Sequence, residues 1–244
     1  MSTKTRTAHR HERAAGALRD RRRRERRRRF LTVAGIVTVL LLVVTAGFLF
    51  TRARDASDDV TAASAGSGSY GVAIGEPTAP HSVVIYEDFL CPYCGQLEAA
   101  TRDDLARLAD EGAVRVEYRP FELLGNMGDY SARSAAAFAV VLEESGPATA
   151  KRFHDLLFDH QPSESGPFLP DEHLLALAVE AGANEDEVRA GLGAGTGDAW
   201  VDGATGAAET AGVRGTPTVL LDGAVFTDGR TVEELADKLV ARLR

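Results

Sequence analysis

The chain has 244 residues, of which 44% are hydrophobic and 26% charged, and these values exclude a wholly disordered or collagen-like protein. Two cysteines are too few for a disulfide-stapled miniprotein or for a self-contained four-cysteine zinc module. The net charge of −8 hides a division along the chain. Residues 1–29 contain 13 basic and 3 acidic side chains, residues 30–50 contain none, and the rest contains 15 basic and 33 acidic side chains.

The uncharged segment, FLTVAGIVTVLLLVVTAGFLF, predicts a transmembrane helix over residues 30–50. At about 1.5 Å per residue, a helix of this length crosses a hydrocarbon core of roughly 30 Å. A cleaved signal peptide is the alternative. Its apolar region is usually shorter, and the small residues with cleavage spacing, Val44 and Ala46, lie inside the apolar run. We therefore favour an uncleaved signal anchor.

The distribution of arginine predicts how the chain is oriented. The block Arg21–Arg29 directly precedes the apolar segment, whereas only Arg52 and Arg54 follow it closely. By the positive-inside rule, residues 1–29 form a basic cytoplasmic tail, and residues 51–70 form a flexible linker to an extracytoplasmic domain at 71–244. Nucleic-acid binding is the alternative reading of the arginine block. Beside a membrane helix a topological role is simpler, so no nucleic-acid partner is expected.

A strand followed by a reactive helix is predicted at the start of this domain. Ser82–Tyr86 is a short β-branched run typical of a buried strand. The sequence Cys91-Pro92-Tyr93-Cys94 follows, and Pro92 suits the first position of a helix. The residues that then recur at helical spacing are Cys94, Leu97, Thr101, Leu105 and Leu108.

This placement predicts a redox-active pair. The Cys91 sulfur would face the unpaired N–H groups and the positive dipole end of the helix, which favour the nucleophilic thiolate. Cys94, on the inward stripe, is the natural resolving cysteine. A zinc site is the weaker alternative, because the domain offers as further ligands only His81, His154, His160 and His173. A structural disulfide closing so short a loop would stabilise the fold little.

Further elements are predicted toward the C-terminus. Pro217, in Gly215-Thr216-Pro217-Thr218, can start a strand, and Asp222-Gly223 marks a tight turn after it. Thr231 and Glu234 form a capping box for a terminal helix. Apolar residues at helical spacing predict four helices near 130–144, 147–160, 170–182 and 184–192.

Together these motifs resemble the DsbA-like disulfide oxidoreductases, within the thioredoxin superfamily. The resemblance covers about residues 71–244, and it rests on Cys-Pro-Tyr-Cys, on Gly-Thr-Pro-Thr and on three intervening segments: Tyr118–Phe121, Ser131–Ala137 and Phe153–Phe158. It implies an α/β thioredoxin fold with an α-helical subdomain inserted at about 127–208.

The resemblance also implies roles for individual residues. Cys91 would be the attacking and Cys94 the resolving cysteine, with Pro92 and Tyr93 between them. The Thr216–Pro217 bond would be cis, and the Thr216 backbone would pair with an extended client chain. A membrane quinone-linked thiol oxidase would re-oxidise the pair.

One position departs from the superfamily pattern. Thioredoxin-like sites often carry a buried carboxylate six residues before the first cysteine, and here that residue is Ile85. Asp88 is the better candidate for a proton acceptor, with a solvated loop acid as the alternative. Strand alternation places Ile85 and Glu87 on one face, so we expect that they are not both buried. Phe89 and Tyr93 either shape an apolar rim for clients or simply pack.

The leading hypothesis is a membrane-anchored, extracytoplasmic thiol–disulfide oxidoreductase that forms disulfides in cysteine-containing exported proteins. A reductase or isomerase using the same site is the second hypothesis, because the sequence does not decide the direction of exchange. A tethered, non-catalytic client-binding module is the third. No cofactor and no metal are expected.

Overall fold

The computed structural model describes residues 70–244. The predicted basic tail at 1–29, the transmembrane helix at 30–50 and the linker up to residue 69 lie outside the described residues. Within residues 70–244, none of the helices has the length and apolar character that a membrane crossing needs.

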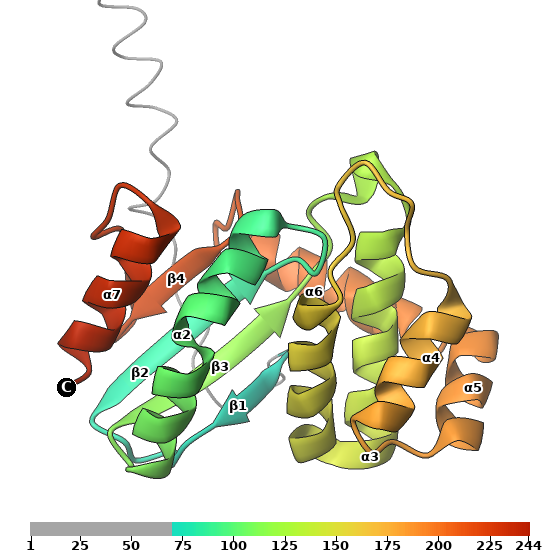
Figure 1. The fold of residues 1–244 in the computed structure, drawn as a ribbon, viewed down its shortest axis with the longest axis horizontal. Coiled ribbons are helices and arrows are strands. Elements are labelled where there is room, and N and C mark those ends of the chain that lie inside the picture. Colours follow the sequence, from blue (N-terminus) through green and yellow to red (C-terminus); the bar gives the residue numbers. More distant parts are fainter. Residues whose placement is uncertain (1–69) are drawn as a thin grey trace, which may run out of the picture. The chain divides into compact units, whose positions relative to one another are not determined.

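A five-stranded mixed sheet forms the centre of the domain (Figure 1). Its strands lie in the order β1 (Val72–Ile74), β3 (Val114–Pro120), β2 (His81–Glu87), β4 (Thr218–Leu221) and β5 (Ala224–Val225). β2 and β3 are parallel and the other neighbours antiparallel. Parallel neighbours need a crossover, and α2 (Pro92–Asp110) supplies it.

Alternation along β2 gives the sheet two buried faces. Val83 and Ile85 join the larger core cluster, which includes residues of α2 and of α7 (Val232–Arg242). Val84 and Tyr86 join a second cluster with Ala204 and Ala208 of α6 (Asp198–Thr210). Because both faces are covered, β2 is apolar along most of its length, as the sequence predicted.

The helical subdomain begins with α3 (Tyr130–Asp159), which bends sharply at Gly146 and Pro147. Gly146 has a φ of 79°, a conformation that suits glycine. The two arms of α3 agree with the helices predicted at 130–144 and 147–160, and in Figure 1 both arms rise from the bend, so that the chain descends along one and ascends along the other. The short 3-10 helix η2 (Gly125–Met127) precedes α3.

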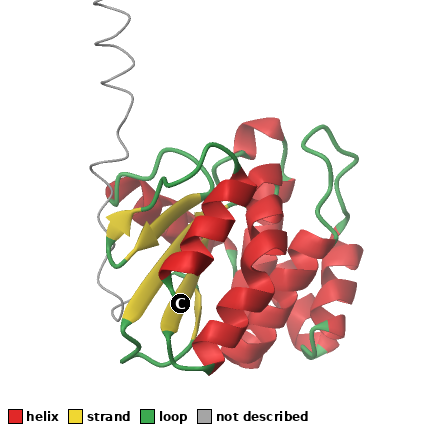
Figure 2. Ribbon diagram, turned by 60° about the vertical axis from the view of Figure 1, so that its left-hand side comes forward, coloured by secondary structure: helices red, strands yellow, loops and turns green. Residues whose placement is uncertain are grey.

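The remaining helices of the subdomain are α4 (Asp171–Glu180) and α5 (Glu185–Ala194), close to the predicted ranges. Figure 2 shows the helical layer beside the sheet. Core residues of α3, α4 and α5 belong to the same cluster as those of α2, so one apolar core joins the subdomain to the sheet. α6, which the sequence analysis did not predict, lies at the end of the expected insertion and packs on the sheet.

The predicted C-terminal strand, turn and helix are confirmed, and one half of the predicted capping box forms, while the Glu234 carboxylate accepts the Arg230 N–H. Asp222 and Gly223 have φ values of 52° and 82° and connect β4 to β5. The Glu234 backbone N–H donates to the Thr231 hydroxyl over 3.2 Å at the start of α7.

Candidate active site

The two cysteines lie at the beginning of α2, where the sequence analysis placed them. Cys91 is the N-cap residue with an extended backbone (φ −74°, ψ 116°), and Pro92 occupies the first helical position. The N–H groups of Cys94 and Gly95 donate to the Cys91 carbonyl over 3.0 and 3.2 Å. Both thiols are free, and both residues are buried. The whole predicted stripe of α2, from Cys94 to Leu108, is buried as well.

The two thiols have opposite electrostatic surroundings. The pKa of Cys91 is lowered to about 6, first by a hydrogen bond with the Cys94 thiol, against the opposing effect of burial. Hydrogen bonding with Thr216 and with the backbone of Cys94 and Tyr93 lowers it further. Burial raises the pKa of Cys94 well above its ordinary value, and the hydrogen bond with Cys91 adds to this effect. These opposite shifts favour the thiolate at Cys91 and the thiol at Cys94, as expected if Cys91 is the nucleophile of the pair.

The Thr216–Pro217 loop faces this pair although it lies more than 120 residues away in the sequence. The Thr216–Pro217 bond is cis, as the resemblance implied. The Cys91 thiol donates to the Thr216 carbonyl over 3.4 Å. The antiparallel pairing of β4 with β2 positions the loop, because β4 begins at Thr218 and its first paired residue lies opposite Tyr86.

The two aromatic residues near the cysteines differ. Tyr93 is 58% exposed and is available to a client chain. Phe89 is 1% exposed and packs against the rings of Phe138, Phe158 and His154. Of the two alternatives weighed for this pair of aromatic residues, a rim position fits Tyr93 and core packing fits Phe89.

Asp88 is fully buried, so its reading as a solvated loop acid is wrong. Its Oδ2 accepts hydrogen bonds from the N–H groups of Leu123 and Leu124 and from the Ser131 hydroxyl, over 2.8, 2.9 and 2.5 Å. Its Oδ1 accepts the Leu90 N–H over 2.8 Å. These contacts tie the segment before Cys91 to the segment that leads into α3. A role for Asp88 as proton acceptor stays a prediction.

Glu87 is also buried, 1% exposed, together with Ile85, 2% exposed. The expectation that these two neighbours on one strand face would not both be buried is therefore wrong. The physical reason is a partner on another element: Glu87 Oε1 lies 2.6 Å from Nε2 of His154 in α3. A hydrogen-bonded ionisable partner offsets part of the cost of burying a carboxylate, and without one that cost is several kcal/mol higher.

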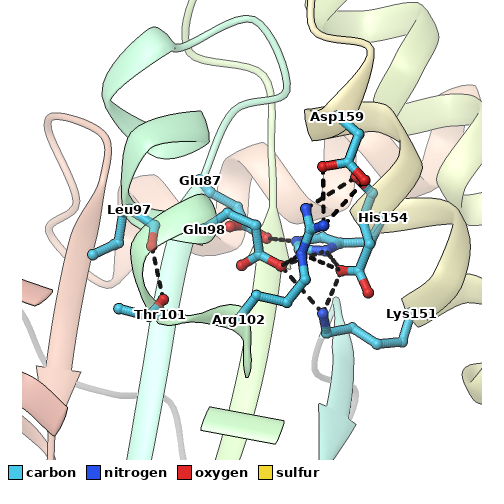
Figure 3. A network of polar contacts seen from close by, with 9 residues as sticks. Glu87, Leu97, Glu98, Thr101, Arg102, Lys151, His154 and Asp159 are labelled. Carbon is cyan, nitrogen blue, oxygen red and sulfur yellow. Dashed lines mark hydrogen bonds and ion pairs between the residues drawn. The ribbon is translucent and has the colours of Figure 1, made fainter. Parts of the chain in front are cut away.

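His154 belongs to a larger network of ionisable groups between α2 and α3 (Figure 3). Its Nδ1 lies 2.9 Å from Asp155 and 3.7 Å from Glu98. Lys151 contacts both Glu98 and Asp155, and Arg102 pairs with Glu98 and, over 2.9 and 3.0 Å, with Asp159. Four carboxylates thus face three cations when His154 is protonated.

The network retains a proton at neutral pH. Burial lowers the pKa of His154, but the charges of Glu87 and Glu98 outweigh it and raise the pKa to about 9. Burial raises the pKa of Glu87, partly offset by His154. The charge of Glu87 in turn contributes to the raised pKa of Cys94. The network therefore lies within electrostatic reach of Cys94.

The histidines that the zinc alternative would need do not gather around the cysteines. His154 pairs with Glu87, and His81 pairs with Asp222 over 3.0 Å. His160 and His173 lie together, with ring centroids 5.8 Å apart. Within residues 70–244, the group of three potential metal ligands that the structure records is Glu98, His154 and Asp155, and Lys151 and Arg102 already compensate its charge.

The site also contains residues that the sequence analysis missed. Glu87 was set aside in favour of Asp88. His154 was weighed only as a zinc ligand, although it lies in the segment Phe153–Phe158 that carried part of the resemblance. Gln161, whose side chain contacts the backbone on both sides of Cys91, gave no sequence signal.

Comparison with known proteins identifies the family. The model of the family described as Thioredoxin matches residues 67–240. The chain belongs to this family. It is similar to the reduced disulfide bond oxidoreductase DsbG of Mycobacterium tuberculosis, with a TM-score of 0.60 and 32% identity over 71% of this chain and 85% of that one. It is likewise similar to oxidised DsbA of the same organism, with a TM-score of 0.59 and 32% identity over 71% of this chain and 90% of that one.

Among curated proteins, the chain is 31% identical over 175 residues to the Na(+)/H(+) antiporter NhaA 3 of Salinispora tropica, covering 70% of this chain and 25% of that protein. The chain thus spans about a quarter of the length of the curated relatives it matches. For the domain itself, the structural matches confirm the α/β thioredoxin fold and the prediction of a thiol–disulfide oxidoreductase.

Proposed function

We propose that this protein is a membrane-anchored, extracytoplasmic thiol–disulfide oxidoreductase that introduces disulfides into exported proteins. One observation carries the direction of exchange: the pKa of Cys91 is lowered to about 6, while that of Cys94 is raised. A stabilised Cys91 thiolate favours the reduced enzyme, and a redox pair with a stable reduced form is an oxidant. This argument favours the oxidase over the reductase or isomerase alternative.

The proposed cycle begins with the Cys91–Cys94 disulfide. A client thiolate attacks the Cys91 sulfur, so that a client–Cys91 disulfide forms and the Cys91–Cys94 bond breaks. Cys94 leaves as a thiolate and takes up a proton, since its surroundings favour the thiol. A second client thiolate then attacks the client sulfur and releases the Cys91 thiolate. The client has lost two electrons, which the enzyme holds as its two reduced cysteines.

Other parts of the site have matching roles in this proposal. The Thr216 backbone pairs with the extended client chain, and Tyr93, being exposed, contacts the client beside the cysteines. The Glu87–His154 pair, whose charge influences Cys94, is a buried source of a proton for that thiolate, while Asp88 keeps the role of candidate proton acceptor predicted from the sequence. A membrane quinone-linked thiol oxidase accepts the two electrons and restores the disulfide.

The most direct test is to trap clients in cells. Cys94→Ser removes the resolving thiol, so mixed disulfides between Cys91 and exported proteins should accumulate and be identified by mass spectrometry. Cys91→Ser, the matched control, should trap none and should abolish turnover. If Cys91→Ser retains the activity of the unchanged protein in cells, the protein is instead a non-catalytic client-binding module.

The direction of exchange has its own measurement. Equilibration of the full chain with glutathione buffers should give a reduction potential well above the about −270 mV of thioredoxin. A potential near that value would assign the protein to the reductases.

The location is tested separately. In a Cys91→Ser/Cys94→Ser background, Ser67→Cys should react with a membrane-impermeant thiol reagent on intact cells. Reaction only after lysis would place the domain in the cytoplasm and contradict the proposed topology.

A further inference from the structure

The Gln161 side chain, which lies two residues beyond the end of α3, reaches the active-site loop. Its Nε2 donates to the carbonyl of Phe89 over 2.8 Å and to the carbonyl of Cys91 over 3.0 Å. One amide group therefore links the carbonyl of the Phe89–Leu90 peptide to that of the Cys91–Pro92 peptide. The same Cys91 carbonyl also accepts the first backbone hydrogen bonds of α2.

A second observation, at Gly95, indicates that this contact is built into the fold. Gly95 is an interior residue of α2, where glycine costs about 0.5–1 kcal/mol relative to alanine. A Cβ atom at this position would lie 2.6 Å from Oε1 of Gln161 and 3.3 Å from its Cδ. The absence of a side chain at Gly95 makes the space that the Gln161 amide fills.

The end of α3 that carries Gln161 is itself attached to α2. Arg102 of α2 pairs with Asp159 through both carboxylate oxygens and donates to the Asp155 carbonyl over 3.2 Å. The Gln161 N–H continues the last turn by donating to the Phe158 carbonyl over 3.2 Å. The position of the Gln161 amide is therefore set by the helical subdomain.

We propose that Gln161 is a positioning residue, through which the helical subdomain holds Cys91 in the extended N-cap conformation that its reactivity requires. This inference rests on the proposed function. In that conformation the Cys91 thiol donates to the Thr216 carbonyl, and the backbone of Tyr93 and Cys94 at the start of α2 lowers the pKa of the thiol. The bridge between the Phe89 and Cys91 carbonyls restricts rotation of the loop away from this arrangement. It also draws the partial negative charge of both carbonyls toward an amide donor.

Gln161→Met tests the proposal, because methionine is similar in length and has no donor. The matched control is Gln96→Met, which makes the same change at an exposed position of α2. Two quantities are measured on the full chain: the pH dependence of thiolate absorbance in the reduced form, and the redox equilibrium with glutathione. Gln161→Met should make the Cys91 thiolate less favoured and the enzyme less oxidising, by roughly threefold to tenfold in equilibrium constant, the range expected for hydrogen bonds of this kind. Gln96→Met should change neither quantity.

A double-mutant cycle separates this role from general loosening of the loop. Gly95→Ala should displace the amide and shift the Cys91 titration in the same direction, whereas it should have little effect in a Gln161→Ala background, where the space is free. Equal effects of Gly95→Ala in both backgrounds would overturn the proposal, and so would unchanged titrations in both Gln161→Met and Gly95→Ala.

The failure of the proposed function would look different. It would show as an ordinary Cys91 titration in the unchanged protein, before any variant is compared. Circular dichroism of each variant establishes that its fold is retained, and Gln161 and Gly95 are both partly exposed.

Discussion

Two polar regions adjoin α2, and they differ in the groups that form them: one is neutral and the other is ionisable. At the first turn, Cys91 is surrounded by neutral groups: backbone N–H groups, the Thr216 loop and the Gln161 amide. One turn beyond Cys94, Glu98 and Arg102 enter a network of seven ionisable side chains that joins α2 to α3 and β2. The first region tunes a reactive sulfur, and the second holds two parts of the fold together.

This difference shows whether nearby hydrogen bonds or distant charges set the pKa of Cys91. The chain after residue 50 carries 33 acidic and 15 basic side chains, which would oppose a thiolate. The leading influences on the Cys91 pKa are nevertheless hydrogen bonds and burial, all within its immediate surroundings. Distant charges are screened over about 8–10 Å at physiological salt, whereas oriented donors act at contact. The Cys91 pKa is accordingly governed more by these neighbouring groups than by the net charge of the domain.

The largest expected effect is on the charged region. His154→Leu leaves the buried Glu87 without its partner, whereas Asp155 keeps Lys151, and breaking such a buried pair costs about 3–5 kcal/mol. Urea unfolding of the full chain measures the loss. The pKa of Cys91 should stay unchanged in the folded variant, since His154 is not among its leading influences.

The control for this change is His173→Leu, because His173 is a partly buried histidine whose Nε2 has no hydrogen-bond partner among the described residues. It should cost under about 1 kcal/mol. Equal stability of the two variants would show that the network contributes nothing. A large change in the Cys91 titration of His154→Leu would remove the distinction between the two regions.

A smaller loss of unfolding free energy is expected from Asp88→Asn. Asp88 lies in the sequence between Glu87 of the charged network and Cys91. The amide that replaces Oδ2 cannot accept the N–H groups of Leu123 and Leu124 if the remaining oxygen stays with Leu90. We expect a loss of about 2–3 kcal/mol in unfolding free energy, as for hydrogen bonds to a charged group. Urea unfolding measures it, and amide exchange at Leu123 and Leu124 should become faster.

Asp129→Asn is the matched control, since Asp129 forms an exposed ion pair with Arg133 and should contribute at most about 0.5 kcal/mol. An Asp88→Asn protein as stable as this control would show that the buried carboxylate does not hold the loop.

The smallest effect concerns pH. The pKa of His154 is raised to about 9, so its stabilising contribution is complete below the ordinary histidine pKa of about 6.5 and is lost as the pH rises toward 9. Cys91 acts in the opposite sense, because its lowered pKa stabilises the reduced fold above its ordinary pKa and this contribution is lost as the pH falls through about 6. A Cys91→Ser/Cys94→Ser protein isolates the histidine.

In this cysteine-free protein, the unfolding free energy should fall by about 1–2 kcal/mol between pH 6.5 and 8. Adding Glu87→Gln removes a charge that raises the His154 pKa, so the decline should begin at lower pH. A flat profile in both proteins would contradict the assignment of a proton to the Glu87–His154 pair.

The sequence predicted those features that depend on local spacing. Pro92 and the apolar stripe after Cys94 defined α2, and Asp222-Gly223 defined the β4–β5 turn. The interruption between the two helices of α3 followed from spacing around Gly146 and Pro147. The cis bond before Pro217 came from the resemblance to DsbA-like proteins.

The features that were missed depend on partners distant in the sequence. Strand alternation alone argued against burying Glu87, and only the presence of His154, 67 residues away, makes that burial tolerable. Gln161 follows the end of a helix, in a polar loop. Nothing in the surrounding sequence indicates that its amide donates a hydrogen bond to the carbonyl of Cys91, 70 residues earlier in the chain. Such pairs form when the helical subdomain packs on α2, and the spacing of apolar residues within each helix or strand does not predict that packing.

The central claim is that neutral donors around the first turn of α2 make Cys91 the reactive thiolate. The pH dependence of iodoacetamide alkylation of the reduced full chain, with Cys91 and Cys94 separated by peptide mass spectrometry, tests it most directly. We predict that Cys91 reacts with a midpoint near pH 6, while Cys94 stays unreactive through the ordinary cysteine range. A Cys91 midpoint at or above the ordinary cysteine value of about 8.5, or earlier reaction of Cys94, would contradict the account.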